Sequence, residues 1–515
     1  MSGSTGNRHR TAFRWLLGVL FLLNGPVIGQ AQIAPADGSD VGMIPVVGDL
    51  AMAESLLDEA TPVEPLGTPT AEPLPTAEAI EALTRRLEEL EAEVKKSSAK
   101  KDDSQKKDDA KKADGKKDEA KTDDGGWTDM STDKWNVRMG GHVQMDLINW
   151  AQASPSIVGD QDYFEFRRIR LLAEGTGYGV YDFRLQMTLE PEAVGETLPL
   201  GTVTTPEVKD AYFSINDIPW LGRFRIGNFF VPFGLEQVTN DTFNIFLERS
   251  IPTQGIFTAD REVGMAFYNA SPDKNLSWAY GIFLDSVSES LKERVDDNQG
   301  YRLSSRVNWI PYFDEPTNGR YAIHTGAGVL YTQDNDNRVR FRARPQIHEG
   351  PRLIDSGVLN AGNYTIGNIE SAFVMGPVTI QSEAFLTNVN LTTAENVNLG
   401  GAYVHGSYFL TGESRAYERF GQHGAQFGRN VPFSNFFIVP GGWSPGAVEL
   451  KARWSLLNLN AVNEGQYNDF TFGFNWYLSD RTRMMFDWIH PFTTSETPFG
   501  TTQSDIIGMR WDFNW

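Results

Sequence analysis

The 515-residue chain contains no cysteine, which excludes disulfides, thiolate metal sites and cysteine nucleophiles. After its N-terminus it has no run of about 18 apolar residues, so a mature protein that spans a membrane cannot use helices. It lacks a nucleophile elbow, an HExxH motif and a phosphate-binding glycine loop, and its seven histidines show no ligand spacing. The net charge of -21 comes without a basic stripe, which argues against a nucleic-acid partner. We therefore expect no enzyme, no metal site and no cofactor.

The N-terminus has the pattern of a signal peptide. Three arginines between residues 8 and 14 precede an apolar run over 15–23, which is too short for a bilayer of about 30 Å. Residues 29–31 (Gly-Gln-Ala) then provide the small-x-small pattern that a signal peptidase recognises. This predicts a signal peptide over residues 1–31, cleaved near Ala31; the alternative is a short membrane anchor.

Three segments of different composition follow. Residues 32–76 form a flexible segment rich in Pro, Ala and Glu, in which prolines break any regular element. Residues 77–96 predict a short coiled coil that a homo-oligomer would hold together, or else a lone amphipathic helix on a periplasmic surface. Residues 97–133 form a Lys/Asp-rich linker with no apolar face to bury. The coiled-coil prediction depends on one seam with spacing 3, 4, 3, 4: Ile80, Leu83, Leu87, Leu90 and Val94.

From residue 134 to 515, apolar and polar residues alternate. A period of two places the two sets on opposite faces of a strand. We count about 16 or 17 such stretches of about 8 to 13 residues, long enough to span a bilayer when tilted. A soluble β-sandwich would also alternate. One example has Tyr181, Phe183, Leu185 and Met187 alternating with Asp182, Arg184, Gln186 and Thr188.

Three features favour a membrane barrel over a sandwich. The outward face is unusually aromatic, as expected at membrane interfaces. Connections alternate between short ones and long ones, and we place residues 412–444 among the long ones. The last strand ends in an alternating aromatic barrel signal, Trp511, Phe513 and Trp515. The sequence predicts an all-β fold: a transmembrane antiparallel β-barrel of about 16 strands over residues 134–515, preceded by a short coiled-coil helix and a charged linker.

Several stretches of the barrel region, taken in order, resemble the phosphate-selective porin O and P family. They are FRRIRLLAEG (166–175), KDAYFSI (209–215), RIGNFFVPFGLEQVTND (225–241), LERSIP (247–252), RFRARP (340–345), FLTGESRAY (409–417), GAVELKARWS (446–455) and NWYLSD (475–480). The resemblance implies a 16-stranded trimeric porin of the outer membrane with a constricting loop folded into its lumen.

Four alternating arginines are the strongest local candidate for a functional site. In an extended chain their guanidiniums face one way, about 6.6 to 7 Å apart. Like charges in a row need water or anions to screen them, and a pore lumen supplies both. This matches the family's arginine ladder; the alternative is a solvent-facing strand whose arginines pair with nearby aspartates or lipopolysaccharide. The residues are Arg338, Arg340, Arg342 and Arg344.

A second group is implied by the resemblance alone. In the family, an arginine pair, an early-strand arginine and an aspartate before an Ala-Tyr pair help to form the central anion site. Carried onto this chain, these are Arg167, Arg168, Arg138 and Asp210, of which Arg138 has only a positional match. The alternative is a structural ion-pair network.

The sequence thus predicts a porin for passive diffusion of phosphate or other small anions, with no catalytic role. The expected partners are small anions, outer-membrane lipid, the barrel-assembly machinery and two further copies in a homotrimer. Residues 125–515, which contain the barrel region, nevertheless carry a net charge of about -14, which by itself favours cations. A general or sugar porin, and an outer-membrane anchor that tethers the envelope through the coiled coil, remain as alternatives.

Overall fold

The computed structural model describes residues 128–129, 134–158, 161–190, 206–284, 300–334, 336–437 and 442–515. The predicted signal peptide, the flexible segment, the coiled-coil seam and most of the charged linker lie outside the described residues. Within the described ranges, none of the helices has the length and hydrophobicity needed to cross a bilayer.

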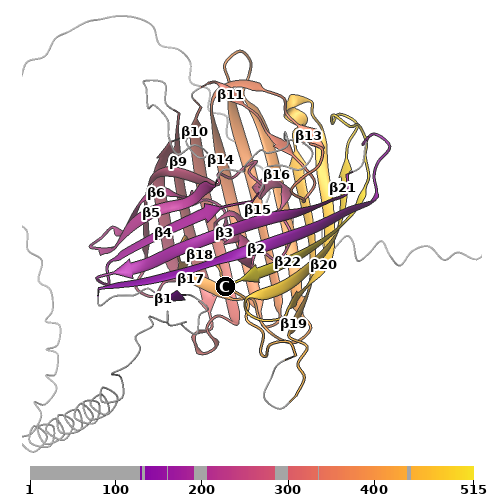
Figure 1. The fold of residues 1–515 in the computed structure, drawn as a ribbon. Helices are drawn as coiled ribbons and strands as arrows, with labels where there is room; N and C mark the ends of the chain where they lie inside the picture. Colours follow the sequence, from indigo (N-terminus) through magenta and orange to yellow (C-terminus); the bar gives the residue numbers. More distant parts are fainter. Residues whose placement is uncertain are drawn as a thin grey trace, which may run out of the picture. The chain divides into compact units, whose positions relative to one another are not determined.

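The described part is a closed antiparallel barrel of 16 strands (Figure 1). Each strand pairs with the next along the chain, and β22 pairs with β2 to close the circle. The strands are β2 (Trp135–Gln152), β3 (Tyr163–Gly177), β4 (Tyr181–Thr188), β5 (Glu207–Ile218), β6 (Gly222–Phe230), β7 (Arg261–Ala270), β8 (Leu276–Leu284), β9 (Tyr301–Phe313), β10 (Tyr321–Gln333), β14 (Leu359–Met375), β15 (Val378–Leu391), β16 (Val397–Phe409), β19 (Ala447–Asn458), β20 (Gln466–Tyr477), β21 (Thr482–Thr493) and β22 (Asp505–Asn514).

Short elements decorate this barrel. Strand β1 (Thr128–Asp129) pairs with β2, and β11 (Arg338–Val339) pairs with β14. Two small hairpins are separate from the barrel sheet: β12 (Arg342–Ala343) with β13 (Ile354–Asp355), and β17 (Tyr417–Gly421) with β18 (Gly424–Phe427). The helical turns are α3 (Leu235–Val238), η1 (Asp241–Phe243), η2 (Ile251–Thr253), η3 (Glu315–Thr317) and η4 (Asn460–Val462).

The period of two in the sequence becomes an apolar outside and a polar inside. Along β9, Leu303, Val307 and Trp309 are exposed on the outer face, whereas Arg302 and Arg306 are buried on the inner face. Aromatic rings stack across neighbouring strands of the outer wall: Phe470 on Phe492, Phe472 on Trp488, and Phe474 on Phe486. An apolar band of this kind is what lipid requires of a transmembrane barrel.

The C-terminal strand closes the barrel against β2. Trp511, Phe513 and Trp515 alternate with buried neighbours and face outward. Trp515 exchanges backbone hydrogen bonds with Gly141, at 3.1 and 3.3 Å. Position 141 requires glycine because a Cβ there would lie 2.5 Å from the Trp515 ring. The C-terminal residues that were predicted as a barrel signal therefore belong to the strand whose pairing with β2 closes the barrel.

The expected alternation of short and long connections fails at one place. We call the end of the barrel where β2 begins and β22 ends the turn end, and the opposite end the loop end; short turns in such barrels are periplasmic. The connection from β16 to β19 (410–446), expected among the long loops, leaves the barrel at the turn end because β16 runs toward it. Its hairpin β17–β18 packs inside the barrel rather than outside it.

The buried apolar core lies inside the barrel, where two long connections fold against the wall. The connection 231–260, here called the inner loop, contributes Phe233, Leu247 and Phe257 to the largest apolar cluster. The connection 334–358, here called the arginine loop, contributes Phe341 and Ile347 to the same cluster. These buried contacts place polar and charged residues of both loops beside the remaining open lumen.

Candidate functional site in the barrel lumen

The inner loop is fixed to the opposite wall by charged side chains. The carboxylate of Glu383 on β15 accepts hydrogen bonds from the backbone N–H groups of Leu235, at 2.9 Å, and Glu236, at 2.7 Å. The carboxylate of Asp487 on β21 accepts another from the Leu247 backbone, at 3.0 Å. A loop held at several points in this way can narrow the lumen at a defined place.

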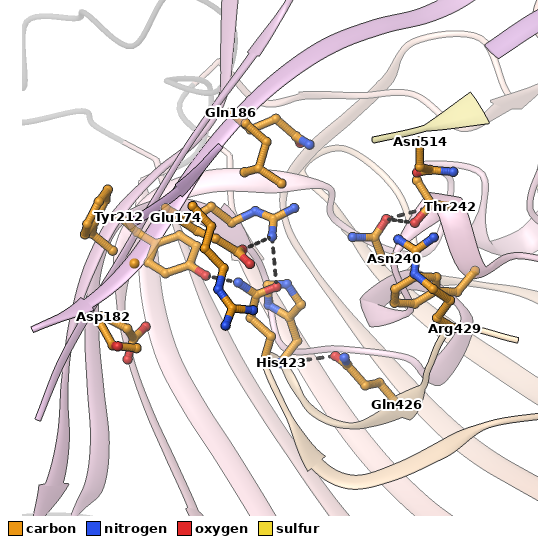
Figure 2. Close-up of a pocket in the computed structure, with 18 of the residues that line it drawn as sticks. Glu174, Asp182, Gln186, Tyr212, Asn240, Thr242, His423, Gln426, Arg429 and Asn514 are labelled. Carbon is orange, nitrogen blue, oxygen red and sulfur yellow. Dashed lines mark hydrogen bonds and ion pairs between the residues drawn. The ribbon is translucent and has the colours of Figure 1, made fainter. Parts of the chain in front are cut away.

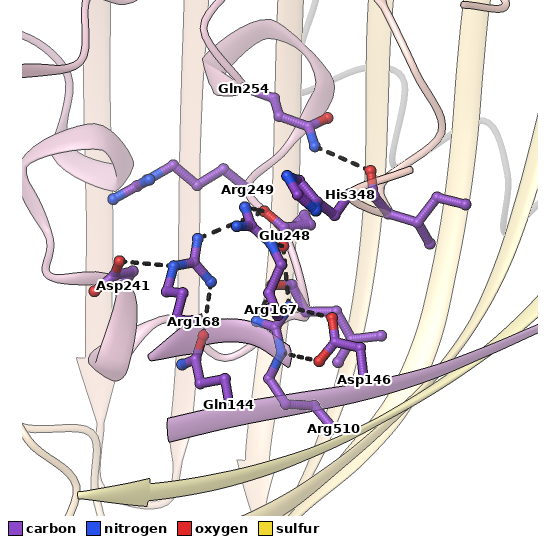
Figure 3. A network of polar contacts seen from close by, with 12 residues as sticks. Gln144, Asp146, Arg167, Arg168, Asp241, Glu248, Arg249, Gln254, His348 and Arg510 are labelled. Atoms are coloured by element: carbon purple, nitrogen blue, oxygen red, sulfur yellow. Dashed lines mark hydrogen bonds and ion pairs between the residues drawn. The ribbon is translucent and has the colours of Figure 1, made fainter. Parts of the chain in front are cut away.

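On its other side, the inner loop presents two carboxylates to the arginines of β3 (Figure 3). Glu248 forms an ion pair with Arg167, with 2.7 Å between Nε and Oε1. Asp241 lies 3.0 Å from Arg168 and 2.6 Å from Arg170 through its Oδ2 atom. All of these side chains except Arg167 are almost fully buried. The arginine pair that the resemblance assigns to anion binding is thus brought to the lumen, and each member has a carboxylate partner.

Glu248 also joins the last strand to this network. Arg510 on β22 forms a two-pronged pair with Asp146 on β2, with both N···O distances at 2.6 Å, and lies 3.0 Å from Glu248. Charge-assisted pairs of this geometry are stronger than neutral hydrogen bonds. The network therefore connects the barrel seam to the inner loop.

Asp210 on β5 lies beside this network, and its partners are arginines of β4 and β7. Its carboxylate accepts from Arg184 Nε at 3.1 Å and from Arg261 Nε at 2.8 Å. The guanidinium of Arg261 lies over the Phe230 ring at 3.9 Å, which fixes its orientation. Sequence reasoning selected Asp210 but missed both of its arginine partners, although Arg184 belongs to a polar set that alternates along its strand.

The arginine loop keeps the alternation that its sequence predicts. Val339, Phe341 and Ala343 are buried, whereas Arg338, Arg340 and Arg342 are exposed and Arg344 is half-buried. The Phe341 ring packs on Phe257 of the inner loop and on Tyr364 of β14. The aromatic anchor thus turns the arginine side of the segment away from the barrel wall.

The four arginines differ in their partners. Arg340 pairs with Asp355, with 2.8 Å between Nε and Oδ1, and Arg344 lies 3.4 Å from Glu349. Among the described residues, Arg342 has no carboxylate within 4 Å. The same holds for Arg352, a loop residue that sequence reasoning missed because no periodic signal marks it. Burial, together with the guanidiniums of Arg344 and Arg342, lowers the pKa of Arg352 to about 10, so it remains charged at neutral pH.

A cavity of about 650 Å³ lies between the arginine loop, the inner loop and strands β3 to β5. We call it the loop-side cavity. Nine cationic side chains line it, against six carboxylates, which leaves an excess of three positive charges. The cations are Arg167, Arg168, Arg170, Lys209, Arg249, Arg261, Arg342, Arg344 and Arg352, and the carboxylates are Glu190, Glu207, Asp241, Glu248, Asp260 and Glu349. Of the predicted ladder, Arg342 and Arg344 reach this cavity, and Arg338 and Arg340 do not.

A second cavity of about 630 Å³, the turn-side cavity, lies toward the turn end of the barrel, and Figure 2 shows residues that line it. The β17–β18 hairpin forms one side of it, held by Arg306, which donates to the Ala425 carbonyl at 2.9 Å, and by Arg225 beside His423. Six arginines and three carboxylates line this cavity, again an excess of three. They are Arg138, Arg184, Arg223, Arg225, Arg429 and Arg481, with Glu174, Asp182 and Glu418.

The four residues that the resemblance assigned to one central site therefore lie at different levels. Arg167 and Arg168 line the loop-side cavity, and Arg138 lines the turn-side cavity. Asp210 is buried between Arg184, which lines the turn-side cavity, and Arg261, which lines the loop-side cavity. Within the ranges described, no group of histidine and carboxylate side chains has the arrangement of a metal site.

Sequence comparison identifies the family. A model of the family described as "Phosphate-selective porin O and P" matches residues 137–515, which is the whole barrel. The chain belongs to this family. It is accordingly an outer-membrane porin, a channel and not an enzyme.

Individual relatives are more distant. A Caulobacter vibrioides protein described as uncharacterized is 30% identical over 309 residues, which cover 58% of this chain and 56% of that protein. The match thus spans only about half of that relative. Porin O of Pseudomonas aeruginosa is 22% identical over 398 residues, which cover 70% of this chain and 84% of that protein.

Two solved porins also match the chain at low similarity. OmpT of Vibrio cholerae in its trimer form is 10% identical, with a TM-score of 0.46, and the match covers 74% of this chain and all of that one. An anion-selective porin from Comamonas acidovorans is 12% identical, with a TM-score of 0.41, and has the same two coverages.

Proposed function

We propose that this porin prefers anions and passes phosphate or similar small oxyanions. One observation carries the proposal: both lumen cavities have an excess of three positive charges, although the chain as a whole is strongly acidic. Fields in water are screened within about 8 to 10 Å at physiological salt, so the nearest side chains determine which ions enter.

The path follows the arginines from one cavity to the other. An anion entering at the loop end meets Arg342 and Arg352, which have no carboxylate partner among the described residues. It then reaches the β3 arginines beside the inner loop, and afterwards Arg184 and the arginines of the turn-side cavity. Guanidiniums replace part of its hydration with fixed hydrogen-bond donors. Because most of these guanidiniums are already paired with carboxylates, they bind the anion weakly enough for it to leave.

The proposal also includes export with cleavage near Ala31 and assembly as a homotrimer. The homotrimer is supported by the apolar seam over residues 77–96, which suits a helix that packs against copies of itself. A general porin without phosphate preference is the second candidate, and the pairing of Arg167 and Arg168 with inner-loop carboxylates favours it.

The deciding experiment is single-channel recording of the refolded full-length protein in planar bilayers. Under a KCl gradient we expect a reversal potential that favours chloride, and added phosphate should reduce the chloride current. A chloride preference without phosphate block would select the general porin. A cation preference would contradict the proposal.

A further inference from the structure

The two lumen cavities are separated by a belt of charged residues at the level of the inner loop. Along β3, Arg168 and Arg170 line the loop-side cavity, whereas Leu172, the next inward-facing residue, lines the turn-side cavity. In the inner loop, the change from lining one cavity to lining the other occurs at a single residue. Asp241 lines the loop-side cavity, and its neighbours Asn240 and Thr242 line the turn-side cavity. Asp241 therefore stands at the boundary that a permeating ion must cross.

The carboxylate of Asp241 occupies a position suited to an anion. One of its oxygens, Oδ2, is shared by two guanidiniums, at 3.0 Å from Arg168 Nε and 2.6 Å from Arg170 Nη1. The side chain is only 6% exposed. The turn that carries it is fixed by the Asn240 side chain, which accepts a hydrogen bond from the Thr242 N–H at 3.0 Å. An oxyanion crossing the boundary needs the same donors that Asp241 already uses.

Asp241 is the nearest carboxylate to both Arg168 and Arg170. The other carboxylates beside these two arginines, Glu248 and Glu190, lie farther away, each at an N···O distance of 3.9 Å. The inner loop as a whole adds negative charge to the lumen, because residues 231–260 contain four carboxylates and one arginine. Without Asp241 both arginines would lose their nearest carboxylate, and a passing anion could take its position.

We propose that Asp241 is a specificity-determining residue of this channel: a built-in counter-ion that occupies the anion position between Arg168 and Arg170. It weakens the binding of permeating oxyanions and thereby allows them to leave quickly. This inference rests on the proposed anion preference. A channel needs binding that is favourable enough for entry and weak enough for release, and an internal carboxylate that competes for the same donors provides that balance.

The test is phosphate block of the chloride current in refolded wild type and in Asp241→Asn. We expect inorganic phosphate to block D241N at concentrations about tenfold lower, the effect of one unit charge about 6 Å away at an intermediate dielectric constant. The anion-to-cation permeability ratio should rise in the same variant. D241E, which keeps the charge, should resemble wild type.

Glu370→Gln is the matched control. Glu370 is a buried carboxylate paired with Arg306 at 2.9 Å and with His324 at 3.2 Å, and it lines neither cavity. E370Q should leave phosphate block within about twofold of wild type, because its charge lies off the path. If D241N does not refold, D241S removes the same charge and keeps a small hydrogen-bonding side chain.

The outcomes distinguish a failure of this inference from a failure of the proposed anion preference on which it rests. If wild type prefers anions and D241N needs the same phosphate concentration for block as wild type, or a higher one, Asp241 is only a structural partner and this inference is wrong. An equal gain in E370Q would also overturn it, because the effect would then not depend on position. A cation-preferring wild type that phosphate does not block would overturn both the proposed function and this inference.

Discussion

Replacing Arg342 with alanine should weaken the anion preference measurably, whereas replacing Arg338 should have little effect. Both arginines are exposed on the same side of the arginine loop, four residues apart. Arg342 lines the loop-side cavity without a carboxylate partner among the described residues, and Arg338 does not line it. The comparison therefore varies the position of a charge while its type and exposure stay the same.

The size of the effect follows from Coulomb's law. At about 7 Å in water, one unit charge stabilises an anion by about 0.6 kcal/mol, which corresponds to about threefold in occupancy. Because the same charge repels a cation equally, the permeability ratio should change by about sevenfold in dilute salt. Screening over a Debye length of about 10 Å at 0.1 M salt reduces this to about threefold. The loss is one of the three excess charges of that cavity.

The assay is the reversal potential of single channels under KCl gradients at two mean salt concentrations. R342A should lower the anion-to-cation permeability ratio more in the dilute solution. R342K keeps the charge but loses the planar fork of donors, so it should retain the ratio while phosphate block weakens. The reasoning would be refuted if R338A and R342A changed the ratio equally, because the cavity would then not determine selectivity.

Three further substitutions test the framework around the path. Glu248→Gln should destabilise the barrel by about 3 to 5 kcal/mol, because it removes the carboxylate that pairs with Arg167 and with the buried guanidinium of Arg510, and urea unfolding in detergent would measure this; an unchanged midpoint would show that these pairs contribute nothing. Gly141→Val should reduce the fraction that refolds to a closed barrel, judged by heat-modifiable gel mobility, because its Cβ would meet the Trp515 ring; refolding at the wild-type level would contradict the closing role of this contact. Replacing the β17–β18 hairpin with a short turn should raise conductance and lower anion preference, because the hairpin fills part of the lumen; conductance at or below the wild-type value would show that it does not restrict the path.

The period of two made the barrel predictable. It places side chains on two faces whatever the strand packs against, so the apolar outer wall and the inward Arg184 and Gln186 followed from spacing alone. The same rule predicted that Arg338, Arg340 and Arg342 share a side, and in the structure these three are exposed while Val339 and Phe341 between them are buried. It could not say which of these arginines reaches the open lumen, because that depends on how Phe341 anchors the loop.

Ion pairing across the lumen was beyond prediction from spacing. Asp210 and Arg261 are separated by 51 residues, and Arg167 and Glu248 by 81. Asp210 and Arg261 lie on separate strands, β5 and β7, and the contact of Arg167 with Glu248 depends on an inner loop whose path is set by Glu383 and Asp487 on the far wall. The direction of the 410–446 connection was missed for a related reason. The expected alternation of short and long connections did not allow for a long one at the turn end, whereas the number of preceding strands decides at which end a connection lies.

The acidic barrel region and its cationic lumen are compatible because charge acts over short distances. A net charge near -14 for residues 125–515 is a sum over walls, loops and ends, whereas an ion in the lumen responds mainly to charges within about 10 Å. The carboxylates that do reach the lumen, such as Asp241 and Glu248, are held against arginines on β3. They reduce the positive excess without reversing it, which leaves cavities that attract anions but bind them loosely. Total charge is therefore a poor guide to the selectivity of such a channel, and the balance of charge among the side chains that line its lumen is a better one.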